Sequence, residues 1–188
     1  MKRSLVLLFF AIPAILWSFG TPDEMAPGLY ADISTSRGNL LFLLDYKGAP
    51  LTVTNFCGLA EGSLPNSFSS PGEPYFDGLT FYREAPDYAL FSGDPTDSGE
   101  GGPGYTIPRE TGGAFSAAVP GALLMDGFFS EASGSRFFIT MIPDSFLDTK
   151  FTVFGQMVDG SKTLKKLKKG DIVKSVKIIR IGDQAENI

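Results

Sequence analysis

From residue 30 onward, the hydrophobic pattern becomes typical of β-strand segments. Tyr30 and Ile33 belong to one such segment, and residues 40–44 form a second apolar segment. Gly38 and Asn39 lie between the two, and both residue types are favoured in tight turns. The pattern therefore predicts a β-hairpin with its turn at Gly38-Asn39.

A helical period follows this hairpin. Pro50 suits the first turn of a helix, and Gly62 suits the position just after its end. The apolar residues at helical spacing between them are Val53, Phe56, Cys57 and Ala60. We predict a helix here, with Cys57 as a small buried residue rather than a reactive thiol, because no cationic residue lies close to it in sequence.

A second short helix and a last strand are predicted near the C-terminus. Residues 159–170 fit a helix capped by Ser161, with Leu164 and Leu167 facing inward and five lysines facing outward. A lysine run of this kind is either a solvated surface or a docking patch for an anionic lipid or partner. Apolar residues of 172–181 alternate with lysine and arginine, as in a half-buried strand that completes a sheet.

Two segments, 63–73 and 94–104, are rich in glycine, proline, serine and acidic residues, which predicts surface loops within one domain. The second loop lacks the Gly-Lys-Ser/Thr ending and the following helix of a phosphate-binding loop. Its acidic residues also miss the ligand spacing of an EF-hand. We therefore expect neither a nucleotide site nor a calcium site there.

The amino-acid composition excludes several classes of catalytic mechanism and metal site. The chain of 188 residues has no histidine, which excludes Ser-His-Asp and Cys-His mechanisms and imidazole metal ligands. Its single cysteine excludes an internal disulfide and a thiolate zinc site. A net charge of −5 at pH 7 argues against nucleic acid as a partner. The length suits one domain with a substantial core.

The first 20 residues have the features of a secretory signal. Lys2 and Arg3 precede an apolar run at residues 5–17, shorter than the roughly 20 residues of a bilayer span. Ser18 and Gly20 are small residues suited to cleavage after Gly20. We predict an exported protein of the periplasm or cell envelope, with net charge −7 because cleavage removes two cations from a total of −5. A retained membrane anchor is the alternative.

Two ordered blocks carry a family resemblance. Residues 75–110 join an aromatic segment with one internal arginine, Phe81-Tyr82-Arg83, to a glycine-rich loop. Residues 120–160 contain the sequence Gly134-Ser135-Arg136-Phe137-Phe138-Ile139. In this order the blocks resemble the cyclophilin family of peptidyl-prolyl cis-trans isomerases, and looser similarity extends over residues 31–182.

The resemblance implies a mainly β fold, a closed eight-stranded antiparallel β-barrel capped by two short helices. We accordingly divide the chain into a signal peptide at 1–20, a linker at 21–29, a cyclophilin-like domain at 30–183 and a C-terminal tail at 184–188. Antiparallel strands and short helices are also what the hydrophobic pattern predicts.

Arg83 occupies the position of the family's catalytic arginine. A guanidinium directed at a prolyl nitrogen weakens the amide resonance that creates a rotation barrier of about 18–20 kcal/mol. Such a mechanism requires no nucleophile, metal or cofactor. Strand alternation predicts that Phe81 and Arg83 lie on one face. Without the family motif, a surface arginine paired with Glu84 or Asp87 fits the sequence equally well.

The resemblance also implies an apolar pocket for proline. Its residues here are Tyr88, Phe138, Phe146 and Leu147. Phe138 and Leu147 match the family, whereas Tyr88 stands where phenylalanine is usual and Phe146 where tryptophan or phenylalanine occurs. Hydrophobic periodicity taken alone would assign these side chains to the core.

Several polar positions around this pocket depart from the family. Phe91 and Arg136 replace two glutamines, Ala89 replaces methionine, and Phe151 stands where histidine is common. Gly127 and Phe128 replace an Asn-Ala pair. Without the first glutamine, we expect Arg83 to lose a hydrogen-bond partner that fixes its rotamer, which lowers the rate through lost preorganisation. Arg136 is expected to add a second positive charge nearby.

The resemblance implies an isomerase that assists the folding of exported proteins. Its expected partners are proline-containing polypeptide segments and, with weakened affinity, cyclosporin-like ligands, and a monomer is expected. Two alternatives remain open from the residues: a proline-peptide binding module with an inactive site, and a carrier of apolar ligands inside a β-barrel.

Overall fold

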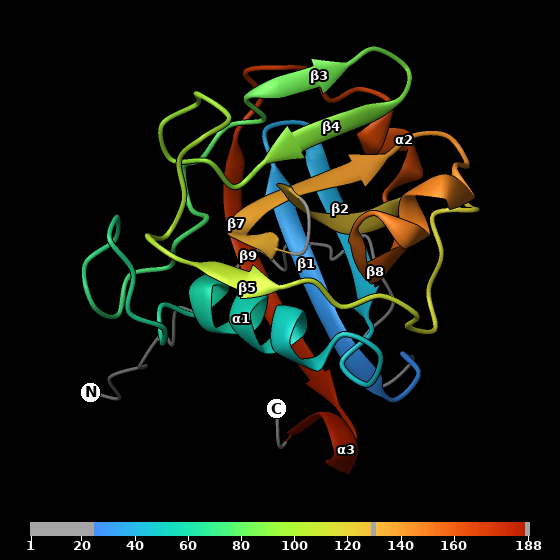
Figure 1. Cartoon of the computed structure of the whole chain (residues 1–188), viewed down its shortest axis with the longest axis horizontal. Coiled ribbons are helices and arrows are strands. Elements are labelled where there is room, and N and C mark those ends of the chain that lie inside the picture. Colours follow the sequence, from blue (N-terminus) through green and yellow to red (C-terminus); the bar gives the residue numbers. More distant parts are fainter. Residues whose placement is uncertain (1–24, 129–130, 187–188) are drawn as a thin grey trace, which may run out of the picture.

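The computed structural model describes residues 25–128 and 131–186, within which nine strands form one curled antiparallel sheet (Figure 1). The strands are β1 (Gly28–Thr35), β2 (Gly38–Leu44), β3 (Arg83–Ala85), β4 (Ala89–Ser92), β5 (Thr106–Pro108), β6 (Ala122–Phe128), β7 (Glu131–Thr140), β8 (Thr152–Asp159) and β9 (Val173–Ile181). The helices are α1 (Pro50–Ala60), the 3-10 helix η2 (Ser145–Thr149), α2 (Ser161–Leu164) and α3 (Asp183–Glu186).

The sheet closes on itself. Its strand order is β3-β4-β7-β6-β8-β2-β1-β9, and β5 pairs with β7 outside this path. The segment before β3 pairs with the start of β9 and the residues just before it. Two backbone hydrogen bonds of 2.8 Å join them: the Phe81 amide donates to the Asp171 carbonyl, and the Val173 amide donates to the Leu79 carbonyl. The predicted antiparallel β-barrel is confirmed, with the short β5 as an addition to the eight strands of the main path.

The N-terminal hairpin is also confirmed, but its turn is displaced from the predicted position. The turn residues are Ser36 and Arg37, and Gly38 is already the first residue of β2, opposite Thr35. The Thr35 hydroxyl donates to the Gly38 carbonyl at 2.6 Å and accepts from the Arg37 amide at 3.1 Å. Gly38 has φ +128°, so glycine is required at the end of the turn rather than at its centre.

Helix α1 begins at Pro50, as predicted, and lies against the sheet near β5 and β9 (Figure 1). Cys57 is buried on this helix, and burial raises the pKa of its thiol to about 12, which confirms it as a core residue. The residue before the helix, Ala49, has no side chain that can cap it. The carboxylate of Glu110 instead accepts hydrogen bonds from the amides of Leu51 and Thr52, at 3.1 and 2.8 Å.

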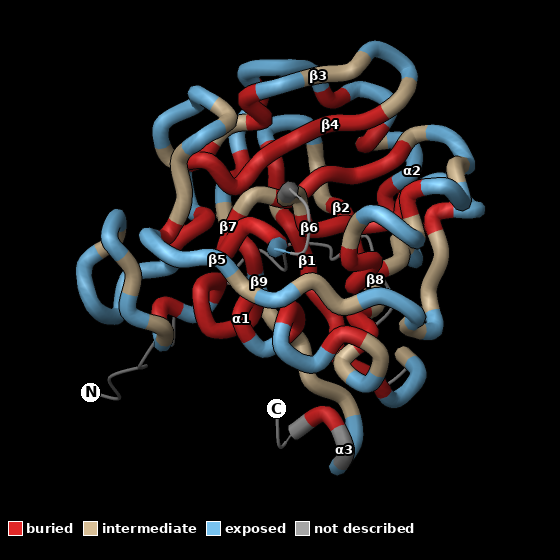
Figure 2. Tube along the Cα trace, viewed as in Figure 1, coloured by how far each residue is buried: buried red, intermediate tan, exposed pale blue. Residues whose placement is uncertain are grey.

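Most residues along β1, β4 and β7 are buried (red in Figure 2). Buried side chains from these and other elements pack together inside the barrel. We call this the inner cluster; its large rings include Phe56, Phe76, Phe137 and Phe154. The Phe56 ring centroid lies 4.9, 5.9 and 5.2 Å from those of the other three rings. Packed aromatic rings in these arrangements make a dense core. This filled interior disfavours the carrier hypothesis, which needs an enclosed ligand cavity.

The C-terminal region follows the prediction in part. Leu164 and Leu167 are buried and the lysines around them are exposed, but α2 has only four residues. Its N-cap is Gly160 at φ +103°, and Ser161 is the first helical residue, so the predicted serine cap is wrong. The backbone turns back here to enter α2, and the left-handed conformation at Gly160 disfavours a residue with a side chain.

The predicted signal peptide, residues 1–20, lies outside the described residues. In the described part of the chain, no helix combines the length and apolar character needed to cross a membrane.

We predict that Glu110→Ala lowers the free energy of unfolding by about 1–2 kcal/mol, because the first turn of α1 loses the acceptor for its free amides. Urea unfolding followed by far-UV circular dichroism measures the change. Glu100→Ala, at an exposed glutamate of the 94–104 loop, is the control. Equal stability of the two variants would contradict a capping role for Glu110.

Candidate active site

A second group of apolar side chains lies on the face of the sheet opposite the inner cluster. Leu90 of β4 and Phe137 of β7 point into the inner cluster, whereas Phe91 and Phe138 point to the other face. We call the second group the outer cluster. Its members are Tyr82, Ala89, Phe91, Ala117, Ala122, Leu124, Phe138, Leu147 and Val153, with Ala85, Tyr88, Phe115 and Phe151 packed against it.

Arg83 lies over an aromatic ring of this cluster. It is opposite Phe91 in the pairing of β3 with β4, and its guanidinium carbon is 3.9 Å from the centre of the Phe91 ring. Phe91 in turn is opposite Phe138 in the pairing of β4 with β7, and these rings stack at 5.0 Å and 26°. Phe151 meets Phe138 edge-on at 5.0 Å. Arg83 is exposed, and among the described residues none accepts a hydrogen bond from its guanidinium or forms an ion pair with it.

The prediction that Phe81 shares a face with Arg83 is wrong. Phe81 belongs to the inner cluster, whereas Arg83 stacks on Phe91 of the outer cluster. Tyr82 also belongs to the outer cluster, and β3 begins only at Arg83. The two-residue alternation of a regular strand therefore does not extend back through Tyr82 to Phe81.

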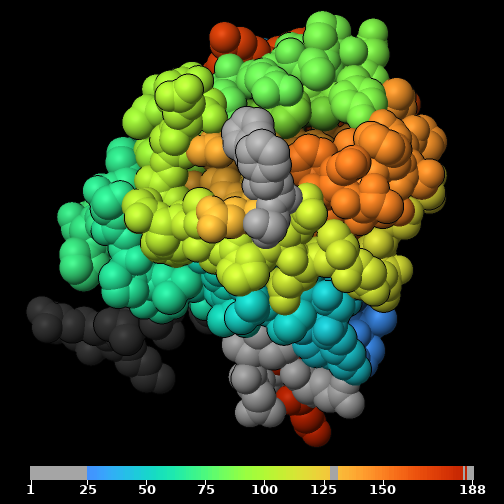
Figure 3. All heavy atoms as spheres, in the orientation of Figure 1, coloured from blue at the N-terminus to red at the C-terminus, as the bar shows by residue number. Residues whose placement is uncertain are grey.

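Tyr88 connects the β4 side of the site to η2. Its hydroxyl donates to Asp144 at 2.5 Å, and the same carboxylate accepts from the Phe146 amide at 3.1 Å as the N-cap of η2. The hydrogen bond to Asp144 raises the pKa of Tyr88, because it favours the protonated phenol. Leu147 of η2 packs in the outer cluster. The Tyr88 hydroxyl, which a phenylalanine would lack, thus joins η2 to the residue that precedes β4. Elements β4 and η2 both lie on the face of the molecule seen in Figure 3.

The structure brings four of the five predicted site residues together. Tyr88, Phe138 and Leu147 lie in or against the outer cluster, and Arg83 joins them through Phe91. Phe138 is only 2% exposed, so it forms the floor of the cluster. Phe146 differs, because its side chain is 66% exposed and its ring faces the ammonium of Lys150 at 5.3 Å. It lies at the rim rather than within the cluster.

Arg136 is an ion-paired residue in this structure. Its Nε lies 3.3 Å from the Asp126 carboxylate, and its Nη1 donates to the Gly101 carbonyl at 2.8 Å. Both charged side chains are largely buried, at 11% and 15% exposure. Asp126 thus offsets the second positive charge expected beside Arg83. Sequence reasoning missed Asp126, although a largely buried arginine needs a carboxylate partner.

The glycine-rich loop at residues 94–104 is organised by Asp94. This carboxylate accepts from the amides of Thr96, Gly99 and Gly101, among other donors, and the residue is fully buried. Burial opposes its ionisation, but these hydrogen bonds outweigh burial and hold the pKa of Asp94 below its ordinary value. The conformation of the loop therefore depends on the ionised carboxylate of Asp94.

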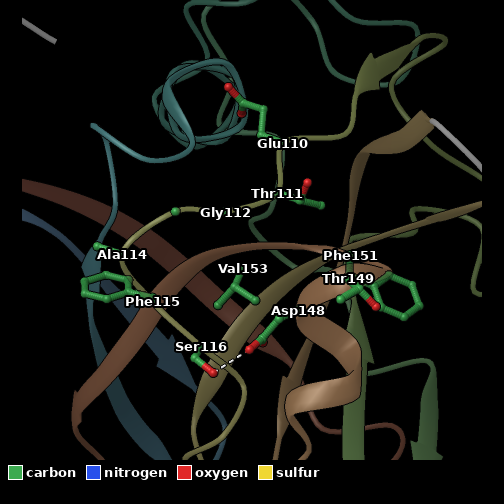
Figure 4. A pocket seen from close by; sticks show the side chains of 11 residues that line it. Glu110, Thr111, Gly112, Ala114, Phe115, Ser116, Asp148, Thr149, Phe151 and Val153 are labelled. Carbon is green, nitrogen blue, oxygen red and sulfur yellow. Dashed lines mark hydrogen bonds between the residues drawn. The ribbon is translucent and has the colours of Figure 1, made fainter.

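A cavity of about 450 Å³ lies beside the outer cluster (Figure 4). Residues 110–116 form one side of it, and residues 148, 149, 151 and 153 form the other. Asp148 joins the two sides by accepting from the Ser116 hydroxyl and the Ala117 amide. Phe151 lines the cavity and also contacts Phe138, so the cavity adjoins the aromatic floor. No local sequence pattern indicated this cavity, because its two sides come together only in the folded chain.

A family model and the amino-acid sequences of known proteins are similar to this chain over most of its length. The family model described as cyclophilin-type peptidyl-prolyl cis-trans isomerase/CLD matches residues 30–183. Peptidyl-prolyl cis-trans isomerase B of Bacillus subtilis is 38% identical over 137 residues, covering 73% of this chain and 88% of that protein. The peptidyl-prolyl cis-trans isomerase of Helicobacter pylori strain 26695 is 34% identical over 156 residues, covering 82% and 89%.

Solved structures agree with these sequence matches. A Cryptosporidium parvum cyclophilin-type peptidyl-prolyl cis-trans isomerase superimposes with a TM-score of 0.70 at 25% identity, covering 81% of this chain and 98% of that one. The same protein crystallised in the presence of the dipeptide Ala-Pro gives a TM-score of 0.68 at 25% identity, with coverage of 82% and 99%.

We predict that Asp94→Asn lowers the free energy of unfolding by about 2–3 kcal/mol at pH 7, because bonds from several donors to a carboxylate are weakened at once. The pKa of Asp94 is lowered in the folded protein, so its contribution is complete above the ordinary carboxyl pKa of about 3.9 and is lost as the pH falls through the lower folded value. The difference between wild type and variant should therefore shrink below about pH 4.

Urea unfolding at several pH values between 7 and 2.5 measures this difference. Asp97→Asn is the matched control, because Asp97 is an exposed residue of the same loop that accepts only from the Thr80 hydroxyl among the described residues. A deficit that stays constant across the pH range would show that Asp94 acts without its charge.

Proposed function

The chain belongs to the cyclophilin family of peptidyl-prolyl cis-trans isomerases, and we propose that it accelerates rotation about prolyl peptide bonds through Arg83. The observation that supports this role is the state of the guanidinium. It is exposed, it is fixed over the Phe91 ring, and no described residue takes up its hydrogen-bond donors. Those donors are available to a substrate.

The chemistry follows from the electronic structure of the amide. A planar prolyl amide is stabilised by delocalisation of the nitrogen lone pair into the carbonyl, and the twisted amide has this lone pair localised on nitrogen. A guanidinium N–H of Arg83 donates to that localised pair better than to the delocalised one. It therefore stabilises the twisted state more than the ground state, which is the condition for catalysis. The bond is not broken, so no nucleophile or proton acceptor takes part.

The outer cluster supplies the apolar surface for the proline ring. Phe138 forms its floor, with Tyr88 and Leu147 beside it. A buried apolar contact holds the ring while the preceding carbonyl rotates, and it keeps water away from the hydrogen bond of Arg83. The exposed ring of Phe146 is placed to contact chain segments that flank the proline.

We propose proline-containing polypeptide segments as the partners of this site. A structural relative was crystallised in the presence of the dipeptide Ala-Pro, which supports this class of ligand. Cyclosporin-like ligands are proposed to bind with weakened affinity, because Phe91 and Arg136 stand at positions where the family carries hydrogen-bonding glutamines. We further propose that the protein acts as a monomer.

We predict that Arg83→Ala lowers catalysed cis-trans exchange of an Ala-Phe-Pro-Phe peptide by about 100-fold or more, since it removes the donor to the twisted amide. Two-dimensional exchange NMR measures the rate, and peptide titration measures the affinity, which should change little. Arg37→Ala, in the turn between β1 and β2, is the matched control. Wild-type protein that binds the peptide without accelerating exchange would instead establish a binding module with an inactive site.

Export is part of the proposed role, because the N-terminal sequence suits a secretory signal and folding of exported chains needs prolyl isomerisation outside the cytoplasm. We predict that the mature protein begins at Thr21. Intact-mass spectrometry of protein from the soluble envelope fraction of expressing cells measures the N-terminus. A full-length mass in the membrane fraction would favour the retained anchor, and a full-length mass in the cytoplasm would reject export.

A further inference from the structure

We infer that Phe91 is the positioning residue of Arg83 and acts through the face of its ring. This inference rests on the proposed catalytic role of Arg83. The guanidinium carbon lies 3.9 Å from the ring centre, within the range in which the ring quadrupole attracts a cation. The two residues are also directly opposite in the β3–β4 pairing, so the backbone sets the contact.

The ring is itself held rigidly. Phe91 is 6% exposed and lies on β4, which is hydrogen-bonded to β3 on one side and β7 on the other. The Phe91 ring also stacks on Phe138 at 5.0 Å, and Phe138 makes an edge-on contact with Phe151 in turn. The cation therefore rests on a ring that is itself held by Phe138, which is buried, and through Phe138 by Phe151, which packs against the outer cluster. A flexible arginine side chain gains a defined position from such a support.

A ring fixes the guanidinium differently from a hydrogen-bonding residue. A glutamine would use one of the N–H donors of Arg83, whereas an aromatic face contacts the guanidinium plane and leaves the donors at its edge free. Arg83 does lack the hydrogen-bond partner that a glutamine at position 91 would provide, and we infer that the ring contact takes over its positioning role. The phenylalanine holds the cation without taking a donor from the substrate.

The second arginine of the site shows the contrast. Arg136 has its donors engaged by Asp126 and Gly101 and is largely buried. It serves to join the β6–β7 region to the 94–104 loop. Arg83, which rests on a ring and has no described acceptor, is the arginine left available for an amide. The two arginines thus differ in role: the contacts of Arg136 stabilise the fold, whereas the ring contact of Arg83 leaves its N–H donors available to a substrate.

The test combines substitutions at position 91 with separate measurements of turnover and binding. Phe91→Leu should lower kcat/KM for the Ala-Phe-Pro-Phe peptide about three- to thirtyfold, the factor that corresponds to loss of a cation–π contact, with peptide affinity nearly unchanged. Phe91→Tyr should retain most of the activity, because its ring keeps the negative face. Phe68→Leu, at an exposed phenylalanine of the 63–73 loop, is the matched control for the same chemical change.

Site-specific fluorinated phenylalanines at position 91 preserve the shape of the ring and test the electrostatic contact directly. Fluorine withdraws charge from the ring face, so turnover should fall stepwise as mono-, di- and trifluoro rings are introduced. The side-chain Nε–H resonance of Arg83 should be shifted upfield by the Phe91 ring and should return toward the free value in Phe91→Leu. Thermal unfolding verifies that each variant is folded.

The outcomes separate this inference from the proposed function. Turnover that survives in Arg83→Ala would overturn the role of Arg83, and with it the inference. Turnover lost in Arg83→Ala but unaffected by fluorination and by Phe91→Leu would overturn the inference alone. Weakened peptide affinity with unchanged kcat in Phe91→Leu would show that Phe91 acts only as a support for Phe138, which also overturns it.

Discussion

The pairing of β4 with β3 on one side and β7 on the other determines the geometry of the whole site. It places Arg83, Phe91 and Phe138 in one row across three strands, with each residue opposite the next. Because alternate residues of the same strands fill the barrel, any slip in register would move these side chains to the other face and expose Leu90 and Phe137. The stability of the inner cluster therefore fixes the position of the outer one.

Carboxylates organise the irregular segments that surround this sheet. Asp94 holds the glycine-rich loop, Glu110 caps α1, and Asp148 ties residues 116 and 117 to η2. Each accepts backbone amides that no helix or strand satisfies, which is the usual requirement for a loop that packs against a core. Some of the carboxylates that make the chain acidic thus stabilise its loops and helix ends.

Hydrophobic period and turn residues act over short distances, so the sequence allowed the N-terminal hairpin, α1 and the loop segments to be predicted, whereas the closed eight-stranded barrel was implied by the family resemblance. The sequence also allowed Arg83, Tyr88, Phe138 and Leu147 to be assigned to one site, although this required the family resemblance. The Arg136–Asp126 pair, the cap from Glu110 and the cavity at residues 110–116 could not be predicted. Each joins segments that are distant in the chain or on different strands, and no local pattern records such contacts. The exposure of Phe146 was missed for the same reason, since aromatic character does not tell whether a ring faces a cluster or solvent.

The departures at positions 91 and 151 have a common physical effect. Both put phenylalanine where the family carries a polar side chain, and both rings contact Phe138. In the mechanism proposed above, this apolar surrounding lowers the local dielectric constant around a bound substrate, which strengthens a hydrogen bond from Arg83 to a prolyl nitrogen. The same proposal implies that recognition depends more on the shape of the proline ring and less on its flanking amides, because groups that would bind the substrate backbone are absent from these two positions. The polar shell of the family is thus replaced by an aromatic one that can serve the same cation by a different interaction.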